Sequence, residues 1–267
     1  MNAITYGAPF SAYQESAGIN ASLLSVVRKS TLHARDYLDN PKSSTSAMIA
    51  GTLAHAVLLE PNRAIIAVAC DRRTNAGKAE YADALERAGA DGIVCATDDR
   101  DRALAMFEAV RRNRTARMIV EQTQHEVSMF WAGAYGQAKG RADMLSASKL
   151  ADYKTTAQIE HLAFMRTSEN LWYHGKIGWY AEGLKAITGD IPEAWIIAQE
   201  ASSPYDVAVY RIPAHVIEQG RKEAVELAMR WRVAEATGIY QGVAPDVLEY
   251  ERPAWAAGSD EVEIPTE

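Results

Sequence analysis

Between residues 125 and 155, the sequence alternates apolar residues with polar or small ones. Three segments, HEVSMFWAG, GQAKGRADMLSAS and KLADYKT, alternate in this way and are separated by glycine or serine clusters. Alternating side chains point to opposite faces of a strand, and short glycine-containing turns join neighbouring strands. The stretch therefore predicts three adjacent antiparallel strands, and any fold of this chain must pack around them.

Patterns on both sides of this stretch predict helices and further strands. The expected helices span residues 19–41, 44–61, 75–90, 98–120, 157–189 (as one helix or two, ending at Gly189) and 214–238, and the expected strands span 62–71, 193–201 and 205–213. This order predicts an α/β or α+β fold with a mixed β-sheet flanked by helices. We expect one domain over residues 1–255 and a disordered acidic tail over 256–267.

The charge balance limits the binding partners that the sequence can be expected to have. A net charge of −7 argues against a generally basic nucleic-acid binder, although a local basic groove is compatible with it. Two clusters could line such a groove, one with Arg72, Arg73 and Lys78 and the other with the arginines of residues 111–117. A solvated surface face is the alternative reading of either cluster.

The apolar runs and the cysteines limit the cellular setting. No apolar run approaches the roughly 20 residues of a membrane span, and the first residues lack the basic and apolar regions of a signal peptide. Cys70 and Cys95 are too few for a disulfide framework or a four-cysteine metal site, and we expect structural roles for them. The sequence thus predicts a cytoplasmic protein without a membrane partner.

The two strands after residue 136 carry two acids and a lysine in a suggestive order. Asp143 is followed nine residues later by Asp152, and Lys154 shares a strand face with Asp152 while Tyr153 points the other way. If the strands pair, two carboxylates and the Tyr153 carbonyl form an oxygen site suited to Mg²⁺ or Mn²⁺, and the lysine could orient a water. A surface hairpin with scattered charges is the alternative, and the spacing alone favours it.

Two further residues could join these groups. His55 follows Gly51 by one helical turn, and the small glycine would let another element approach the helix closely. A core histidine with satisfied hydrogen bonds is the alternative for His55. Glu126 opens the strand before Asp143, where it could be functional or simply an exposed acid at a strand end.

The order of helix histidine, strand glutamate, strand aspartate and D-x-K resembles the PD-(D/E)XK nucleases, and within them the RecE-type exonucleases (exonuclease VIII) of phage recombination. The resemblance extends from about residue 19 to residue 255, and its segments are GTLAHAVLLEP, RRTNAGKAE, GRADML, DYKTTA and WYHGKIGWYAEG. It implies a PD-(D/E)XK-like mixed sheet flanked by helices.

The resemblance also implies roles for individual residues. His55, Asp143 and Asp152 correspond to the metal ligands of the family, Tyr153 lends a backbone carbonyl, and Lys154 corresponds to the catalytic lysine. Glu126 lies where the family tends to carry an acid near the site. The family usually has a glutamine in the helix after D-x-K, but this chain has Lys176 there. A lysine could contact a phosphate, but it cannot accept a hydrogen bond as glutamine can.

By this resemblance we expect a Mg²⁺-dependent 5′-to-3′ exonuclease, with Mn²⁺ as a substitute, that acts on linear double-stranded DNA in a bacterial host cell. Such relatives form homo-oligomeric rings around DNA and pass the exposed 3′ strand to a single-strand annealing protein for recombination. We expect Arg72, Arg73, Lys78 and Lys176 to bind DNA, with the first two or the arginines of 111–117 lining the channel. The loop RRTNAGK could instead only cap a helix.

Two other functions remain open on the sequence alone. One is another PD-(D/E)XK deoxyribonuclease, such as an endonuclease or a CRISPR-associated enzyme, although the chain lacks the four cysteines of the latter. The other is a non-catalytic subunit that binds DNA ends on a nuclease scaffold, an alternative that Lys176 and the acidic charge keep open.

Overall fold

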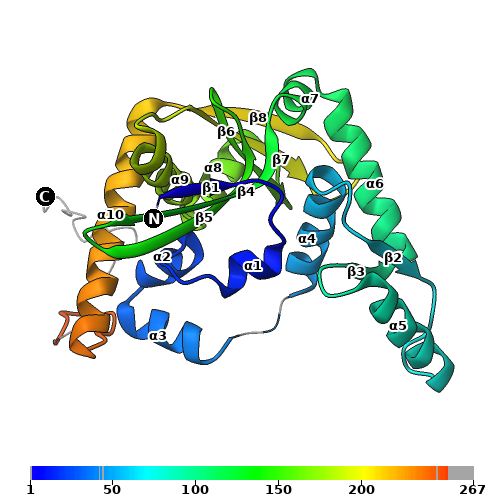
Figure 1. Ribbon diagram of the computed structural model, residues 1–267, viewed down its shortest axis with the longest axis horizontal. Coiled ribbons are helices and arrows are strands. Elements are labelled where there is room, and N and C mark those ends of the chain that lie inside the picture. Colours follow the sequence, from blue (N-terminus) through cyan, green and yellow to red (C-terminus); the bar gives the residue numbers. More distant parts are fainter. Residues whose placement is uncertain (1, 42, 44, 245, 252–267) are drawn as a thin grey trace, which may run out of the picture.

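A six-stranded β-sheet forms the centre of the computed structural model, which describes residues 2–251 apart from 42, 44 and 245 (Figure 1). The strands lie in the order β1-β4-β5-β6-β7-β8; β6 and β7 are parallel, and the other neighbours are antiparallel. They are β1 (Ala3–Thr5), β4 (Gln124–Gly133), β5 (Gly136–Leu145), β6 (Lys149–Thr156), β7 (Glu193–Glu200) and β8 (Val207–Ile212). The predicted mixed sheet, the three antiparallel strands and the later strand pair are confirmed.

Strands β5 and β6 separate shortly after their turn, which opens the centre of the sheet. They pair at Leu145 with Leu150 and at Met144 with Ala151, and the ladder stops there. Strand β4, in contrast, follows β5 over nearly its whole length. The next positions along β5 and β6 are Asp143 and Asp152, so the acids lie where the backbone ladder ends.

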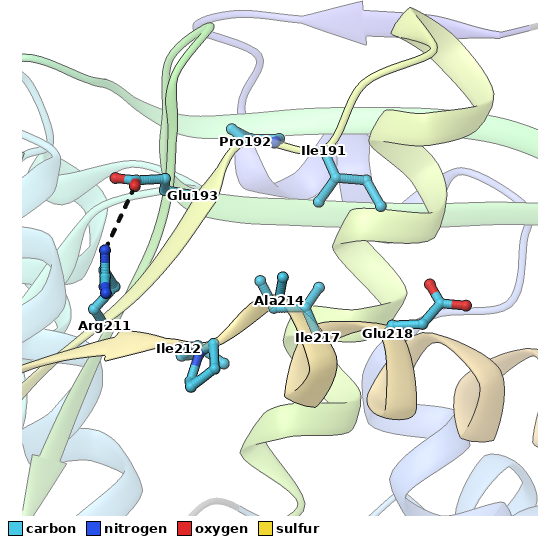
Figure 2. Close-up of a pocket in the computed structure, with 9 residues that line it drawn as sticks. Ile191, Pro192, Glu193, Arg211, Ile212, Ala214, Ile217 and Glu218 are labelled. Atoms are coloured by element: carbon cyan, nitrogen blue, oxygen red, sulfur yellow. Dashed lines mark ion pairs between the residues drawn. The ribbon is translucent and has the colours of Figure 1, made fainter.

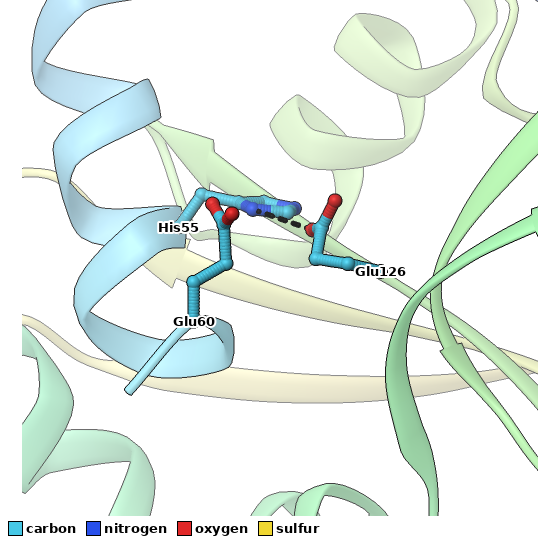
Figure 3. Close-up of side chains that lie close together, drawn as sticks. All are labelled: His55, Glu60 and Glu126. Carbon is cyan, nitrogen blue, oxygen red and sulfur yellow. Dashed lines mark ion pairs between the residues drawn. The ribbon is translucent and has the colours of Figure 1, made fainter. Parts of the chain in front are cut away.

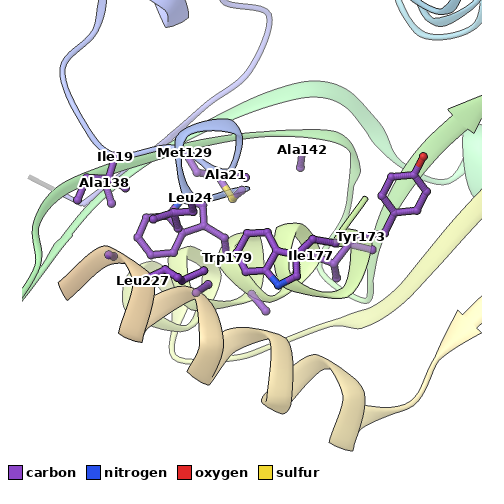
Figure 4. Close-up of a cluster of buried hydrophobic side chains, with 14 of the residues drawn as sticks. Ile19, Ala21, Leu24, Met129, Ala138, Ala142, Tyr173, Ile177, Trp179 and Leu227 are labelled. Atoms are coloured by element: carbon purple, nitrogen blue, oxygen red, sulfur yellow. The ribbon is translucent and has the colours of Figure 1, made fainter. Parts of the chain in front are cut away.

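One face of the sheet is covered by α2 (Ala21–Val27), α9 (Tyr173–Thr188) and α10 (Ala214–Thr237), with α8 (His161–Asn170) leading into α9. Figure 4 shows the buried side chains between the sheet and these helices, where Trp179 of α9 lies among apolar residues of the sheet, α2 and α10. Helices α9 and α10 can approach closely because Gly178 has no side chain. A Cβ at this position would lie only 2.2 Å from the backbone of Gly220. This large apolar layer holds α9, and therefore Lys176, in a fixed position.

The opposite face is covered by α4 (Ser46–Leu59), α6 (Thr97–Arg112) and α7 (Arg114–Glu121). A second apolar cluster lies here and includes Leu58, Val110, Ile119 and Met144. The helical run expected over 98–120 breaks at Asn113, whose side chain accepts a hydrogen bond from the Ala116 amide and donates one to the Val207 carbonyl. An asparagine that satisfies a helix start in this way favours a new helix over continuation.

The single helix expected over 19–41 is wrong, because two helices occupy this region. Helix α2 ends at Val27, and α3 (Thr31–Asp39) starts after Ser30, whose side chain accepts a hydrogen bond from the His33 amide. Ser30 also has an extended backbone, as N-cap residues do. The cap restarts the helix in a new direction, which hydrophobic spacing alone does not reveal.

A small parallel unit stands beside the main sheet, where β2 (Ile65–Val68) and β3 (Ile93–Ala96) are joined by α5 (Asn75–Ala88). Figure 1 shows α5 at the margin of the molecule. The strand expected at 62–71 and the helix expected at 75–90 are confirmed, whereas β1, β3 and α1 (Phe10–Glu15) are short elements that the sequence patterns did not indicate.

The ends of the described chain add two findings. The predicted disordered tail at 256–267 lies outside the described residues. Within the part of the chain that the structure describes, no helix is both long and apolar enough to cross a bilayer.

Candidate functional site

Three carboxylates lie in a row across the adjacent strands β4, β5 and β6. Glu126 lies between the paired positions His125–Met144 and Val127–Ala142, so it stands opposite Asp143. Asp152 stands opposite Asp143 on the other side, one position beyond the last backbone pair of β5 and β6. The predicted convergence of Asp143 and Asp152 is therefore present in the register, and Glu126 extends it to a third strand.

The backbone of β4 turns over at Glu126. Its φ is 55°, in the left-handed region that residues with side chains seldom occupy. Val127 belongs to the apolar layer under α9, whereas the His125 ring contacts the carbonyls of Leu59 and Val120 on the opposite face. His125 and Val127 therefore lie on opposite faces of the sheet, and the Glu126 side chain points toward Asp143. A left-handed backbone at a residue with a side chain is strained, and such strain is often found at functional sites.

His55 connects helix α4 to this row. Its Nδ1 lies 3.1 Å from Glu126 Oε1, and its Nε2 lies 3.1 Å from Asp143 Oδ2. Helix α4 lies close to β6 at Gly51, which has no side chain. A Cβ at this position would lie 3.3 Å from the Thr155 hydroxyl oxygen. The close approach predicted from Gly51 is thus present, and the histidine is a member of the charged cluster.

Lys154 and the Tyr153 backbone complete the arrangement on β6. The Lys154 ammonium pairs with Asp152 and lies 4.0 Å from Asp143 Oδ2 and 3.3 Å from the Tyr153 carbonyl oxygen. The Tyr153 amide donates to Asp143 Oδ2 at 2.8 Å, which replaces the missing ladder between the strands. The Tyr153 side chain points to the other face and bonds to Gln199, as strand alternation requires.

Glu60 also lies at this cluster, although the sequence patterns did not indicate it. It follows the last residue of α4, and His55, Glu60 and Glu126 each offer a ligand atom within 4.8 Å of the others (Figure 3). Arg63 holds Glu60 through a 2.7 Å ion pair. The available signal was its spacing, five residues after His55 at a helix end, but an acid before Pro61 also reads as an ordinary helix terminus.

The charges in the row set the protonation of its members. Burial opposes charge on the His55 ring, but Asp143 and Glu126 outweigh it and raise the pKa of His55 to about 9. Burial also opposes ionisation of Asp143, yet His55 and Lys154 hold its pKa below the ordinary value. For Glu126, burial dominates and raises the pKa. The middle acid of the row is therefore a stable anion between two cations.

These residues fit a divalent cation. Among the described residues, Glu126 Oε1 is buried and accepts no hydrogen bond, although His55 Nδ1 lies 3.1 Å away, while Glu126 Oε2 accepts from Arg141 Nε at 2.6 Å. An unsatisfied carboxylate oxygen beside His55, Glu60 and Asp143 is the donor set of a hard or borderline divalent metal. Asp152 is paired with Lys154 in this structure, and the predicted roles of Asp152 and the Tyr153 carbonyl as ligands stay predictions.

The residues predicted to bind DNA lie in two separate places. Lys176, on α9, is half-buried, and the charges of Asp152 and Lys154 reach it. Arg72, Arg73 and Lys78 are exposed at the start of α5, where the Arg72 guanidinium lies 4.1 Å from the Tyr81 ring centre. The loop caps α5 through Thr74, whose hydroxyl accepts from the Gly77 amide, so its capping role is present whatever else it does.

A cavity of about 600 Å³ lies elsewhere, between the start of β7, the end of β8 and the start of α10. Figure 2 shows its largely apolar wall, with Ile191, Ile212 and Ile217, and Arg211 beside Glu193 at 3.9 Å. None of the predicted site residues lines it. The cavity is therefore separate from the carboxylate row.

Comparison with known proteins identifies the family. A family model described as "PDDEXK-like domain of unknown function (DUF3799)" matches residues 20–237, most of the chain, and the protein belongs to this family. The fold is similar to a crystal structure of a "Putative exonuclease" from Eubacterium rectale, with a TM-score of 0.63 and 13% identity over 93% of this chain and 95% of the other. No curated protein matches the sequence. The PD-(D/E)XK resemblance and its fold are confirmed, and the RecE type stays a prediction.

Proposed function

From membership in this PDDEXK-like family we propose that the protein is a Mg²⁺-dependent exodeoxyribonuclease that degrades linear double-stranded DNA in the 5′-to-3′ direction. The observation that carries the proposal is the row of Glu126, Asp143 and Asp152, which meets His55 from the helix side and Lys154 on its own strand. The similar fold of a protein described as a "Putative exonuclease" supports an exonuclease over other nucleases.

The residues of the row would divide the work of phosphodiester hydrolysis. Glu60, Glu126 and Asp143 would hold a divalent cation together with His55, whose ring must lose one of its two protons to offer a nitrogen to the metal. Asp152 would join when Lys154 releases it. The cation would supply Lewis-acid chemistry, because it neutralises phosphate charge and makes water more acidic. Lys154 would orient the attacking water and offset the negative charge that develops on the phosphate.

The charge on Lys154 fits this role. Burial disfavours its ammonium form, but Asp152 and Asp143 outweigh burial and raise its pKa. The lysine is therefore a cation at neutral pH, which suits charge stabilisation better than service as a general base. The basic residues Arg72, Arg73 and Lys78 would contact the duplex away from the cut, where exposed guanidinium and ammonium groups bind phosphates.

The test compares a 5′-phosphorylated linear duplex with the same DNA as a closed circle. The wild-type protein with Mg²⁺ should release nucleotides from the linear DNA, leave the circle intact, and lose activity in a chelator. Asp143→Asn should abolish cleavage, and the matched control Asp206→Asn, at an exposed loop beside β8, should cleave normally.

Three results would redirect the proposal. Cutting of the closed circle would assign an endonuclease. Binding of DNA ends without nucleotide release in Mg²⁺ or Mn²⁺ would assign a non-catalytic end-binding subunit. Full activity of Asp143→Asn would show that the catalytic site lies elsewhere.

A further inference from the structure

Helix α9 brings a second lysine to the carboxylate row. Tyr173 and Lys176 are three residues apart and lie on the same side of this helix. The Lys154 ammonium lies 5.5 Å from the Tyr173 ring centre, and the Lys176 ammonium lies 5.4 Å from the same centre. One aromatic ring thus supports two cations, one from β6 and one from α9.

The two lysines differ in their partners. Lys154 pairs with Asp152, and Asp143 lies 4.0 Å away. Among the described residues, the Lys176 ammonium has neither a carboxylate within 4.0 Å nor a hydrogen bond, although its side chain is half-buried. Removing an ammonium from water without an anionic partner costs free energy. The arrangement therefore has room for an anion that the protein does not itself provide.

We infer that Lys176 binds a non-bridging oxygen of a DNA backbone phosphate at the carboxylate row. This inference rests on the proposed nuclease function and gives it a substrate-positioning residue. A phosphodiester suits the position because it carries the missing negative charge and because it must reach the neighbouring acids and Lys154 to be cleaved. A lysine binds such a group as a mobile point charge, with no need for the fixed fork that an arginine presents.

Lys176 would position the phosphate in the ground state and the transition state alike. Loss of such an interaction raises KM and weakens DNA binding while kcat changes little. A charged hydrogen bond of this kind predicts a roughly 10- to 100-fold effect. Loss of one phosphate contact also lowers the slope of log affinity against log salt by roughly 0.9.

The experiment uses the full chain with Lys176→Met, Lys176→Gln and, as a matched control, Lys185→Met at an exposed position of the same helix. Binding of a short blunt-ended duplex is measured in a chelator at several salt concentrations, and nucleotide release is measured with Mg²⁺. We expect both Lys176 variants to bind more weakly with a lower salt slope and to show a raised KM, and the control to match the wild type.

Two outcomes separate this inference from the proposed function. If the wild type binds DNA and the Lys176 variants keep its affinity, salt slope and KM, Lys176 does not hold a phosphate and the inference is overturned. If the wild type binds DNA without cleaving it, the nuclease proposal fails while the binding data still decide the role of Lys176. Absence of any DNA binding by the wild type would overturn both.

Discussion

Two lysines near the main sheet, the buried Lys139 and the half-buried Lys176, are held in opposite ways. On β5, the Lys139 ammonium donates to the backbone carbonyls of Tyr13, Gln14 and Ser16, at 3.0, 3.0 and 2.5 Å. At the carboxylate row, Lys176 has no such bond among the described residues. Lys139 caps the C-terminal end of α1, and its ammonium group is fully hydrogen-bonded by the protein. The Lys176 ammonium, in contrast, has no hydrogen-bond acceptor among the described residues. The difference distinguishes a structural cation from one that awaits a ligand.

The largest effect is expected at Lys154, the lysine that pairs with Asp152 in the carboxylate row. Lys154→Met should lower the rate of DNA cleavage by about 1,000-fold, because the site loses the cation that offsets charge on the phosphate. Lys149→Met, at the start of the same strand, should change the rate little. If both variants lost cleavage rate to a similar extent, Lys154 would have no catalytic role that Lys149 lacks. The proposed contrast between a catalytic and a structural lysine would then be wrong for β6.

The next largest effect is expected at Lys139, and it concerns folding. Lys139→Met should lower the free energy of unfolding by about 3 kcal/mol, because three carbonyls lose a charged donor at once. Urea denaturation measures this directly. Lys176→Met should cost none of this stability, since it removes an ammonium that has no anionic partner within 4.0 Å among the described residues. Equal destabilisation by both substitutions would break the comparison between the two regions.

The pH dependence of stability tests the charge balance at the row itself. The pKa of His55 is raised from 6.5 to about 9 by Asp143 and Glu126. A raised pKa stabilises the folded state fully below pH 6.5, and this contribution is lost as the pH rises through about 9. In metal-free protein the loss should be on the order of 3 kcal/mol.

Chemical denaturation at several pH values measures this loss. His55→Gln should flatten the decline between neutral and alkaline pH, whereas His215→Gln, at an exposed position near the start of α10, should leave it in place. An unchanged decline in His55→Gln would show that the carboxylates do not hold a charged histidine.

The sequence predicted the charged row better than it predicted its surroundings. Alternation fixed the faces of Asp152, Lys154 and Tyr153, because strand geometry is local and has a period of two. The position of Glu126 could not be derived that way, because its left-handed backbone breaks the period. Glu60 escaped notice because only the folded position of the α4 end brings it to His55.

The helix break at Ser30 shows the same limit from another side. Hydrophobic spacing continues across residues 19–41, but a single hydroxyl that bonds to the His33 amide ends one helix and begins another. The free energies that decide such a break are about 1 kcal/mol, smaller than the packing that follows from it. Patterns of burial therefore predict the layers of this fold more reliably than its helix ends.

The smallest effect is expected when phosphate supplies the anion that Lys176 lacks. In metal-free buffer, inorganic phosphate at a concentration equal to its Kd for the protein should raise the free energy of unfolding of the wild type by roughly 0.4 kcal/mol, as linkage requires. Lys176→Met should lose this stabilisation, whereas Lys185→Met should keep it. Chloride at matched ionic strength separates binding from screening, because screening acts on every exposed charge alike. Thermal unfolding of the three proteins measures the difference. If phosphate stabilised Lys176→Met as much as the wild type, the phosphate would bind elsewhere. Lys176 would then not be a lysine that binds an external anion, and its contrast with Lys139 would be lost.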